Sequence, residues 1–325
     1  MNHALKIYDI NVNIELIKKY PGGKMHTKNV TPYVAAIIFS LIFGLSFMFT
    51  KKAIMVISVF KLLSFRFLLA FIVMSLLVLC KVIKVDYKNK PIKDLFITCI
   101  AQPVVYFIFE TYAIQYTSSS YAGLFIALIP ICVSIMGIYF LKEMPSRIQW
   151  IFIFLSVAGV IYILLNDTSS INGSANIVGT LFLFVAIISA SVYSIYSRKI
   201  SLHFTSFEIT YFMMGIAAAV FNFIALILDI SNGNANTYFQ PILNKDVIIS
   251  VIYLGILSSV VAYYLMNYSL SKMAASKSTV FANLATIISI VAGVVFLGEN
   301  FYYYHVIGSV MILVGIIGTN YFNTI

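Results

Sequence analysis

The segment YAIQYTSSSYAGLFIALIPICVSIMGIYFLKE, residues 112–143, returns in altered form as YSLSKMAASKSTVFANLATIISIVAGVVFLGE, residues 268–299. A shift of 156 positions without gaps aligns FLKE with FLGE, so that Glu143 meets Glu299. The same shift aligns two pairs of glycines, Gly137 with Gly293 and Gly159 with Gly315. Aligned glycines and glutamates do not arise easily by chance between two apolar segments, so the chain contains an internal repeat.

The composition around this repeat places the chain in a membrane. Of its 325 residues, 61% are hydrophobic and only 10% are charged, and the mean hydropathy is +0.98. A soluble globular protein usually has about 25% charged residues. The chain is therefore predicted to be an integral membrane protein. Its net charge of +10 is explained by where the lysines lie and predicts no nucleic-acid partner.

A transmembrane helix needs about 20 mostly apolar residues. By that measure the sequence holds ten candidate spans, roughly 32–50, 60–80, 94–115, 119–141, 147–166, 176–197, 206–229, 246–268, 278–297 and 301–322. The breaks between them are short and polar. We therefore predict an all-α integral membrane protein with ten transmembrane helices in a lipid bilayer.

Lysine and arginine predict the orientation, because they are more frequent in cytoplasmic loops. If the N-terminus is cytoplasmic, most of them fall on cytoplasmic segments, within 6–28, 81–93, 142–147, 198–199 and 272–277. The prediction is a multi-pass protein of the cell membrane with both termini in the cytoplasm. Residues 1–31 form a cytoplasmic N-terminal lead, and the sequence leaves open whether Met1 or Met25 is the natural start.

The repeat divides the spans into two halves, residues 32–166 with helices one to five and residues 176–322 with helices six to ten. Five is an odd number, so the second half must enter the bilayer from the opposite side. Two antiparallel copies can exchange conformations, which gives inward-open and outward-open states similar energies. This inverted repeat is typical of secondary transporters that work by alternating access.

From about residue 32 the chain resembles the EamA-type family of the drug/metabolite transporter superfamily. The resemblance rests on SFRFLLA (64–70), the quoted segment 112–143, AYYLMNYSLSKMAASKSTVFANLATI (262–287) with FLGE, and GSVMILVGI (308–316). It implies ten helices, a central cavity between the halves, and export of small metabolites or amino acids. The family often has a proline in the fourth helix of each half. Here the first half has Pro130 and the second has Thr286, which does not support a kink in both.

Glu110 is the most costly residue of the predicted spans. No charged residue lies within fifteen positions on either side of it, and a charge at the centre of a membrane helix costs roughly 2.5–3.5 kcal/mol. Arg66 lies at a matching depth in the second span and is its natural partner, with Lys51 or Lys52 as alternates. Three interpretations remain open. The pair is a structural ion pair, Glu110 faces a cavity and handles a proton or a substrate amine, or Glu110 is an interfacial residue with its hydrogen bonds satisfied.

Other polar and aromatic residues fall near the middle of the spans. Gln102 stands beside Pro103, while Asn283 and Thr286 lie opposite the layer of Pro130. Each is a candidate substrate ligand or an interhelical hydrogen bond. Three tyrosines flank these positions and are candidates to line the cavity, Tyr106, Tyr263 and Tyr264.

A second group of residues is predicted to have gating or structural roles. Glu143 and Glu299 close the fourth helix of each half. Pro130 interrupts a helix near mid-span, since proline lacks a backbone donor. Asn267 lies near the cytoplasmic end of the eighth span and is expected to help close an inner gate. Lys52, at the outer mouth, either extends to the interface or captures an anionic substrate group.

The sequence contains no HExxH, no Walker motif and no hydrolase GxSxG, and its four histidines are scattered. No metal, cofactor or enzymatic activity is predicted. The prediction is a secondary transporter that exports small metabolites or amino acids, with proton coupling as one possibility for Glu110. A multidrug exporter and, from a different class, an intramembrane enzyme are the alternatives.

Overall fold

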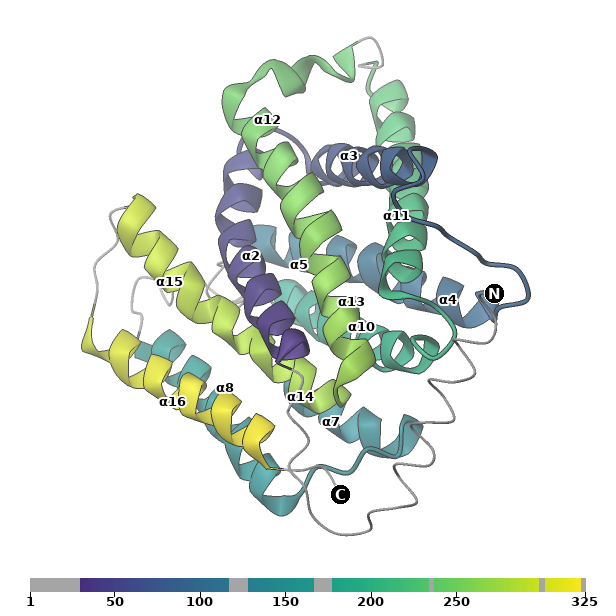
Figure 1. Cartoon of the computed structure of the whole chain (residues 1–325). Coiled ribbons are helices and arrows are strands. Elements are labelled where there is room, and N and C mark those ends of the chain that lie inside the picture. Colours follow the sequence, from purple (N-terminus) through teal and green to yellow (C-terminus); the bar gives the residue numbers. More distant parts are fainter. Residues whose placement is uncertain (1–29, 117–127, 167–176, 234–236, 298–301, 323–325) are drawn as a thin grey trace. The chain divides into compact units, whose positions relative to one another are not determined.

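The computed structural model describes residues 30–116, 128–166, 177–233, 237–297 and 302–322. The following description concerns the compact unit that starts at Pro32. Every regular element described in it is a helix, and each of the ten predicted spans holds helix (Figure 1). Glu299 and residues 119–127 of the predicted fourth span lie outside the described residues.

The first five predicted spans correspond to seven elements. They are α2 (Thr31–Ile54), α3 (Val59–Leu79), α4 (Ile92–Cys99), the π-helical segment η1 (Ile100–Val105), α5 (Tyr106–Tyr116), α7 (Ile129–Phe140) and α8 (Arg147–Asn166). α4, η1 and α5 follow one another without a break and together form the third span.

The last five spans begin with α10 (Ile177–Ile200) and α11 (Ser206–Ser231), followed by a short turn, η3 (Gln240–Leu243). The eighth span contains α12 (Lys245–Ile252), the π-helical segment η4 (Tyr253–Ala262) and α13 (Tyr263–Lys272). The ninth contains α14 (Ala275–Thr279), the 3₁₀ turn η5 (Val280–Asn283) and α15 (Leu284–Leu297), and α16 (Tyr303–Tyr321) is last. In the described part, seven helical stretches are long and apolar enough to cross a membrane.

Side chains at the loops fix where the helices begin. Thr205 and Glu208 form a capping box at the start of α11, in which each side chain accepts a hydrogen bond from the other residue's backbone N–H. Glu208 also binds Lys90 at 2.8 Å and accepts from the N–H of Asp86 at 2.8 Å. The loop that follows α3 is thereby attached to the N-terminus of α11.

Two spans differ from the continuous helices that their apolar sequences predict. In the third span, Gln102 leaves helical geometry (φ −145°, ψ 125°) immediately before Pro103. A proline has no N–H and disfavours helical geometry in the residue before it. The carbonyl of Ala101 accepts hydrogen bonds from the N–H of Tyr106, five residues later, and from the hydroxyl of Ser189 on α10 at 2.6 Å. The second π-helical segment, η4, has no proline.

Pro130 does not interrupt a helix within the described residues, although the sequence predicts an interruption near mid-span. Pro130 stands in the first turn of α7, where the missing N–H removes no helical hydrogen bond. The chain before Leu128 lies outside the described residues.

The glycine pair of the repeat, Gly159 and Gly315, marks the close contact of α8 with α16. A Cβ atom on Gly159 would stand 2.7 Å from the carbonyl oxygen of Gly308. A Cβ atom on Gly315 would stand 2.6 Å from the backbone nitrogen of Ser156. Any larger residue therefore meets backbone atoms that cannot move aside. Small residues allow such approach between membrane helices, where packing rather than the hydrophobic effect holds helices together.

Candidate functional site

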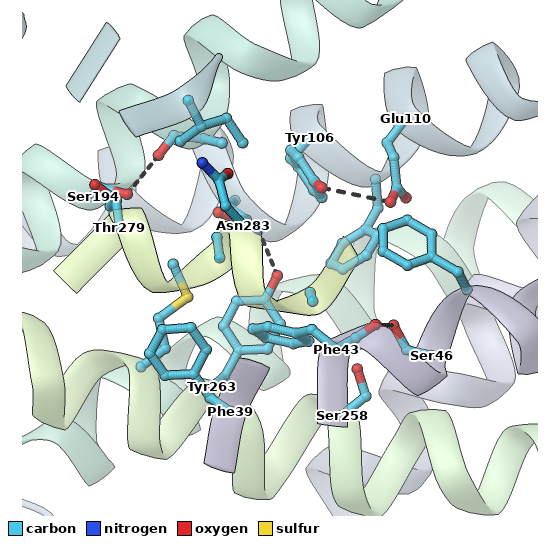
Figure 2. Close-up of a pocket in the computed structure, with 18 of the residues that line it drawn as sticks. Phe39, Phe43, Ser46, Tyr106, Glu110, Ser194, Ser258, Tyr263, Thr279 and Asn283 are labelled. Atoms are coloured by element: carbon cyan, nitrogen blue, oxygen red, sulfur yellow. Dashed lines mark hydrogen bonds between the residues drawn. The ribbon is translucent and has the colours of Figure 1, made fainter. Parts of the chain in front are cut away.

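One cavity, shown in Figure 2 with Tyr106, Glu110, Tyr263 and Asn283 labelled, collects all seven residues that the sequence predicts as substrate ligands. They are Arg66, Gln102, Tyr106, Glu110, Tyr263, Asn283 and Thr286. The cavity has a volume of about 110 Å³. A single water needs roughly 10–15 Å³ of such space, so the cavity has room for a small solute.

Arg66 of α3 is buried, and its guanidinium forms hydrogen bonds with two serines of η4. Its Nε donates to the hydroxyl of Ser259 at 2.8 Å, and its Nη2 donates to the hydroxyl of Ser258 at 2.9 Å. The guanidinium carbon lies 4.4 Å from the centre of the Phe107 ring. Two hydrogen bonds and an aromatic face thus fix the plane of the guanidinium. The third guanidinium nitrogen of Arg66, Nη1, donates to no side chain or carbonyl among the described residues.

Arg66 and Glu110 do not form the direct ion pair that the sequence suggests. Both residues line the cavity, as their matched depth predicts, but no salt bridge within 4.0 Å joins them in the described structure. The serines of η4 and the ring of Phe107 take the hydrogen bonds and the face of Arg66 instead.

Glu110 of α5 is 7% exposed. Its Oε1 receives a long hydrogen bond from the hydroxyl of Tyr106, one turn earlier, at 3.5 Å, which is drawn as a dashed line in Figure 2. The alternative partners Lys51 and Lys52 are exposed at the end of α2. Neither lysine forms a salt bridge in the described residues. The carboxyl group therefore faces the cavity without a cationic side chain in direct contact.

Gln102 joins η1 to α13 across the cavity. Its Nε2 donates to the hydroxyl of Tyr263 at 2.6 Å. Its Oε1 is buried and has no hydrogen-bond partner in the described part of the chain. The break at Gln102 in the third span thus brings the amide of this residue to a tyrosine of the eighth span.

Asn283 and Thr286 extend the cavity along the ninth span. The Nδ2 of Asn283 donates to the hydroxyl of Ser156 on α8 at 3.0 Å, so this amide links the two predicted halves. Thr286 lines the cavity one turn of α15 further on. Asn283 thus forms the predicted interhelical hydrogen bond, and its role as a substrate ligand stays a prediction.

Several lining residues were not predicted. The apolar wall includes three phenylalanines of α2 with Phe107 of α5, and the polar additions are serines and a threonine: Phe39, Phe43, Phe47, Ser46, Ser194, Ser258 and Thr279. The internal repeat could have predicted Ser258 as a lining residue, since the shift of 156 positions aligns it with Gln102. Nothing in the sequence distinguished the phenylalanines from the many that face lipid.

Those residues of the predicted gating or structural group that the structure describes lie outside the cavity lining. Asn267 is fully buried between α10, α11 and α13. Its Oδ1 accepts from Tyr193 at 2.8 Å and from Ser197 at 2.6 Å, and its Nδ2 donates to Thr210 at 3.0 Å. The ring of Tyr193 is 6.2 Å from that of the cavity residue Tyr263. Asn267 therefore joins three helices behind the cavity.

Glu143 follows α7 and binds Arg198 of α10 at 3.0 Å. Lys52 is exposed at the end of α2, and the neighbouring outer lysine Lys61 forms an ion pair with Asp229 of α11 at 2.6 Å. Glu299, the counterpart of Glu143, lies outside the described residues. Within those residues no cluster of three or more His, Cys, Asp or Glu side chains could hold a metal ion.

Comparison with known proteins identifies the class of protein to which this chain belongs. The profile of the EamA-like transporter family matches residues 30–165 and again residues 177–321. The chain is 36% identical to the uncharacterized transporter YcxC of Bacillus subtilis (strain 168), over 89% of this chain and 92% of that protein. It is 26% identical to an uncharacterized transporter of Archaeoglobus fulgidus, over 84% and 92% of the two chains.

A solved crystal structure has a similar fold, with a TM-score of 0.73 and 17% identity over 88% of this chain and 95% of the other. At this identity the likeness concerns the fold alone. Together with the apolar helices, the family match and the related transporters make the chain a multi-pass membrane protein that transports a small molecule, and a transporter rather than an enzyme. The chain belongs to the EamA-like transporter family, within the drug/metabolite transporter superfamily.

Proposed function

We propose that this protein is a secondary transporter that exports small zwitterionic metabolites, amino acids among them, across the cytoplasmic membrane by alternating access. The observation that carries the proposal is the meeting of Arg66, Gln102 and Glu110 with Tyr263 and Asn283 in one buried cavity. The first three come from the predicted first half and the last two from the second. A cavity built from both halves can change its access when the halves move.

The chemistry of the lining fits a small molecule with two charged ends. Arg66 offers a fixed guanidinium, which binds a carboxylate well because its donors are planar. Glu110 offers a carboxyl group on the same cavity, suited to an ammonium group or to a proton. The phenylalanines of α2 provide an apolar surface for the remainder of the solute.

The proposal includes the inverted repeat, with residues 32–166 and 176–322 as its two halves. Three features support it. The family profile matches the chain twice, at residues 30–165 and 177–321. The sequence recurs at a shift of 156 positions, and the π-helical segments η1 and η4 fall in the third and eighth spans. A shift of η1 by that distance gives residues 256–261, which lie within η4.

We propose an orientation with both termini in the cytoplasm, because the lysines and arginines of the connecting segments lie mostly on that side. Labelling of single cysteines at Lys88 and Asn244, one in each predicted compartment, would test this. Each should react with a membrane-impermeant maleimide from one side only, and the two sides should differ.

The transport proposal is tested with purified protein in liposomes loaded with a panel of amino acids and other small metabolites, with and without a pH gradient. Exchange or efflux of at least one zwitterion above protein-free liposomes is expected. If no solute moves under any gradient, the carrier proposal fails.

Glu110→Gln separates two roles for the carboxyl group. If Glu110 carries the coupled proton, the variant should still exchange solute between equal pools but should lose the stimulation by a pH gradient. Loss of both activities would assign Glu110 to substrate binding. Unchanged exchange and unchanged pH dependence would leave Glu110 with a structural role only.

A multidrug exporter is the second candidate, favoured by the aromatic residues of the cavity wall. It predicts transport of planar aromatic cations, and Arg66 would then oppose rather than assist binding. A fluorescent dye cation in the same liposome panel distinguishes the two candidates, because Arg66→Gln should improve dye transport and abolish transport of a zwitterion.

A further inference from the structure

Four elements that line the cavity come together again at one end of the bundle. Ile129 of α7, Ser194 of α10, Tyr263 of α13 and Thr279 of α14 all line the cavity. α10 contacts α7, α13 and α14, and α14 contacts α7 and α13. Figure 1 shows α14 beside α7 in the region where these elements end. We refer to the side on which α7, α10 and α13 end as the latch face.

Glu143 connects two of these ends by both of its oxygens. Its Oε1 accepts from the Nε of Arg198 at 3.0 Å, and its Oε2 accepts from the backbone N–H of Ala275 at 2.8 Å. Ala275 is the first residue of α14, whereas Glu143 follows α7. One carboxylate thus holds the first half of the chain against two elements of the second.

Arg198 also forms hydrogen bonds with the C-terminal end of α13. Its Nη1 donates to the carbonyl of Leu270 at 3.1 Å and to that of Ser271 at 2.9 Å. Arg198 lies four residues after the cavity residue Ser194, so the two occupy neighbouring turns on one side of α10. A change at Arg198 is therefore close, along the helix, to the cavity wall.

The chain between α13 and α14 forms a tight elbow that can transmit movement. Only Met273 and Ala274 separate the two helices. A hydrogen bond of 2.8 Å between the hydroxyls of Ser269 and Ser278 joins the helices on either side. Because the elbow is held together, displacement of its tip would shift α13 and α14 as one body, together with their cavity residues.

We propose that Glu143, Arg198 and the α13–α14 elbow form a latch that keeps the cavity closed on the latch face. Opening on that face requires the carboxylate to release Arg198 and the N–H of Ala275. The latch is a conformational control of the same site and rests on the proposed transport function. Both side chains are only partly buried, with 19% of Glu143 and 27% of Arg198 exposed, so water can solvate them when they separate.

The test measures access to the cavity from each side of the membrane. A single cysteine, Ser194→Cys, is placed in the cavity wall of a full-length protein whose native cysteines are replaced by serine. The probe is a charged, membrane-impermeant maleimide, applied separately to right-side-out and inside-out vesicles. In the background with an intact latch, labelling from the latch face should be slow. The native cysteines to be replaced are Cys80, Cys99 and Cys132.

Glu143→Gln and Arg198→Gln should each raise the labelling rate from the latch face about tenfold, the scale expected for loss of a charge-assisted hydrogen bond. Labelling from the opposite face should stay the same or fall. The matched control is Lys199→Gln. It breaks an ion pair of 3.1 Å with Asp94 beside the latch and should change neither rate.

No change in either variant would overturn the proposal. An equal rise from both faces would also overturn it, since that result indicates general loosening of the fold. The labelling requires no transported solute, so the latch can fail while transport is observed, and transport can fail while the latch behaves as expected.

Discussion

Replacement of Arg66 by lysine tests whether the cavity binds its solute by a fixed guanidinium or by positive charge alone. Arg66→Lys keeps the charge but removes the planar arrangement that reaches Ser258 at 2.9 Å and Ser259 at 2.8 Å. A lysine ammonium also lacks the flat face that lies over Phe107.

The size of the effect follows from these contacts. Loss of one of the two hydrogen bonds from a charged group costs about 1.5–3 kcal/mol. The weaker stacking of an ammonium group on Phe107, with the charge retained, costs about 0.5–1 kcal/mol more, a part of the roughly 2 kcal/mol of a desolvated cation–π contact. Together this is about 2–4 kcal/mol, which corresponds to roughly a 30- to 1000-fold change in an equilibrium constant. Since these contacts position the group that would bind the carboxylate, the loss is expected in substrate affinity.

The assay is solute exchange in liposomes, with a zwitterion that the panel described above identifies. The half-saturating concentration should rise at least 30-fold, the lower end of the range worked out above. Lys61→Arg is the control, because Lys61 pairs with Asp229 outside the cavity lining and should leave half-saturation unchanged. A rise of less than threefold in Arg66→Lys would refute the reasoning, because a positive charge in any geometry would then suffice.

Two further predictions concern the scaffold. Gly315→Ala places a methyl group against the backbone of Ser156 and should destabilise the protein by about 1–3 kcal/mol, as for other overpacked sites. Thermal unfolding in detergent measures this, and Gly137→Ala, whose nearest neighbour is 3.9 Å away, should cost nothing; equal losses would contradict the proposed close contact of α8 with α16. Glu208→Gln removes the ion pair with Lys90, so chymotrypsin should cleave after Tyr87 roughly fivefold faster, equivalent to about 1 kcal/mol. Lys88→Gln, on the exposed part of the same loop, is the control, and an unchanged cleavage rate in Glu208→Gln would show that this carboxylate does not hold the loop.

Much of the architecture could be predicted because it depends on properties that a single segment carries. The length of an apolar run sets a transmembrane helix, and each of the predicted spans holds helix. The glycines of the repeat were found by alignment alone, and Gly159 and Gly315 prove to lie where α8 and α16 approach closely. The π-helical segment η4 was not predicted, since it contains no proline and the mean hydropathy of its span, 2.1, equals that of the continuous helices Thr31–Ile54 and Ile177–Ile200.

The candidate site was predicted in its residues but not in its contacts. Depth along a span follows from sequence position, and it brought Arg66 and Glu110 to the same cavity. The direction in which a side chain points around the helix depends on how ten helices pack, which no single span determines. For this reason Ser258 and Ser259 were missed as partners of Arg66, and Arg198 was missed as the partner of Glu143.

The unpartnered oxygen of Gln102 has a consequence for the energy of the transport cycle. A buried acceptor without a donor costs about 1–3 kcal/mol, and in this conformation the Oε1 of Gln102 is such an acceptor within the described residues. If all other contacts were equal, a conformation that gives this oxygen a donor would be favoured by the same amount, roughly 5- to 150-fold in population. In the proposed transport cycle, Gln102 would therefore act against long residence in the present state.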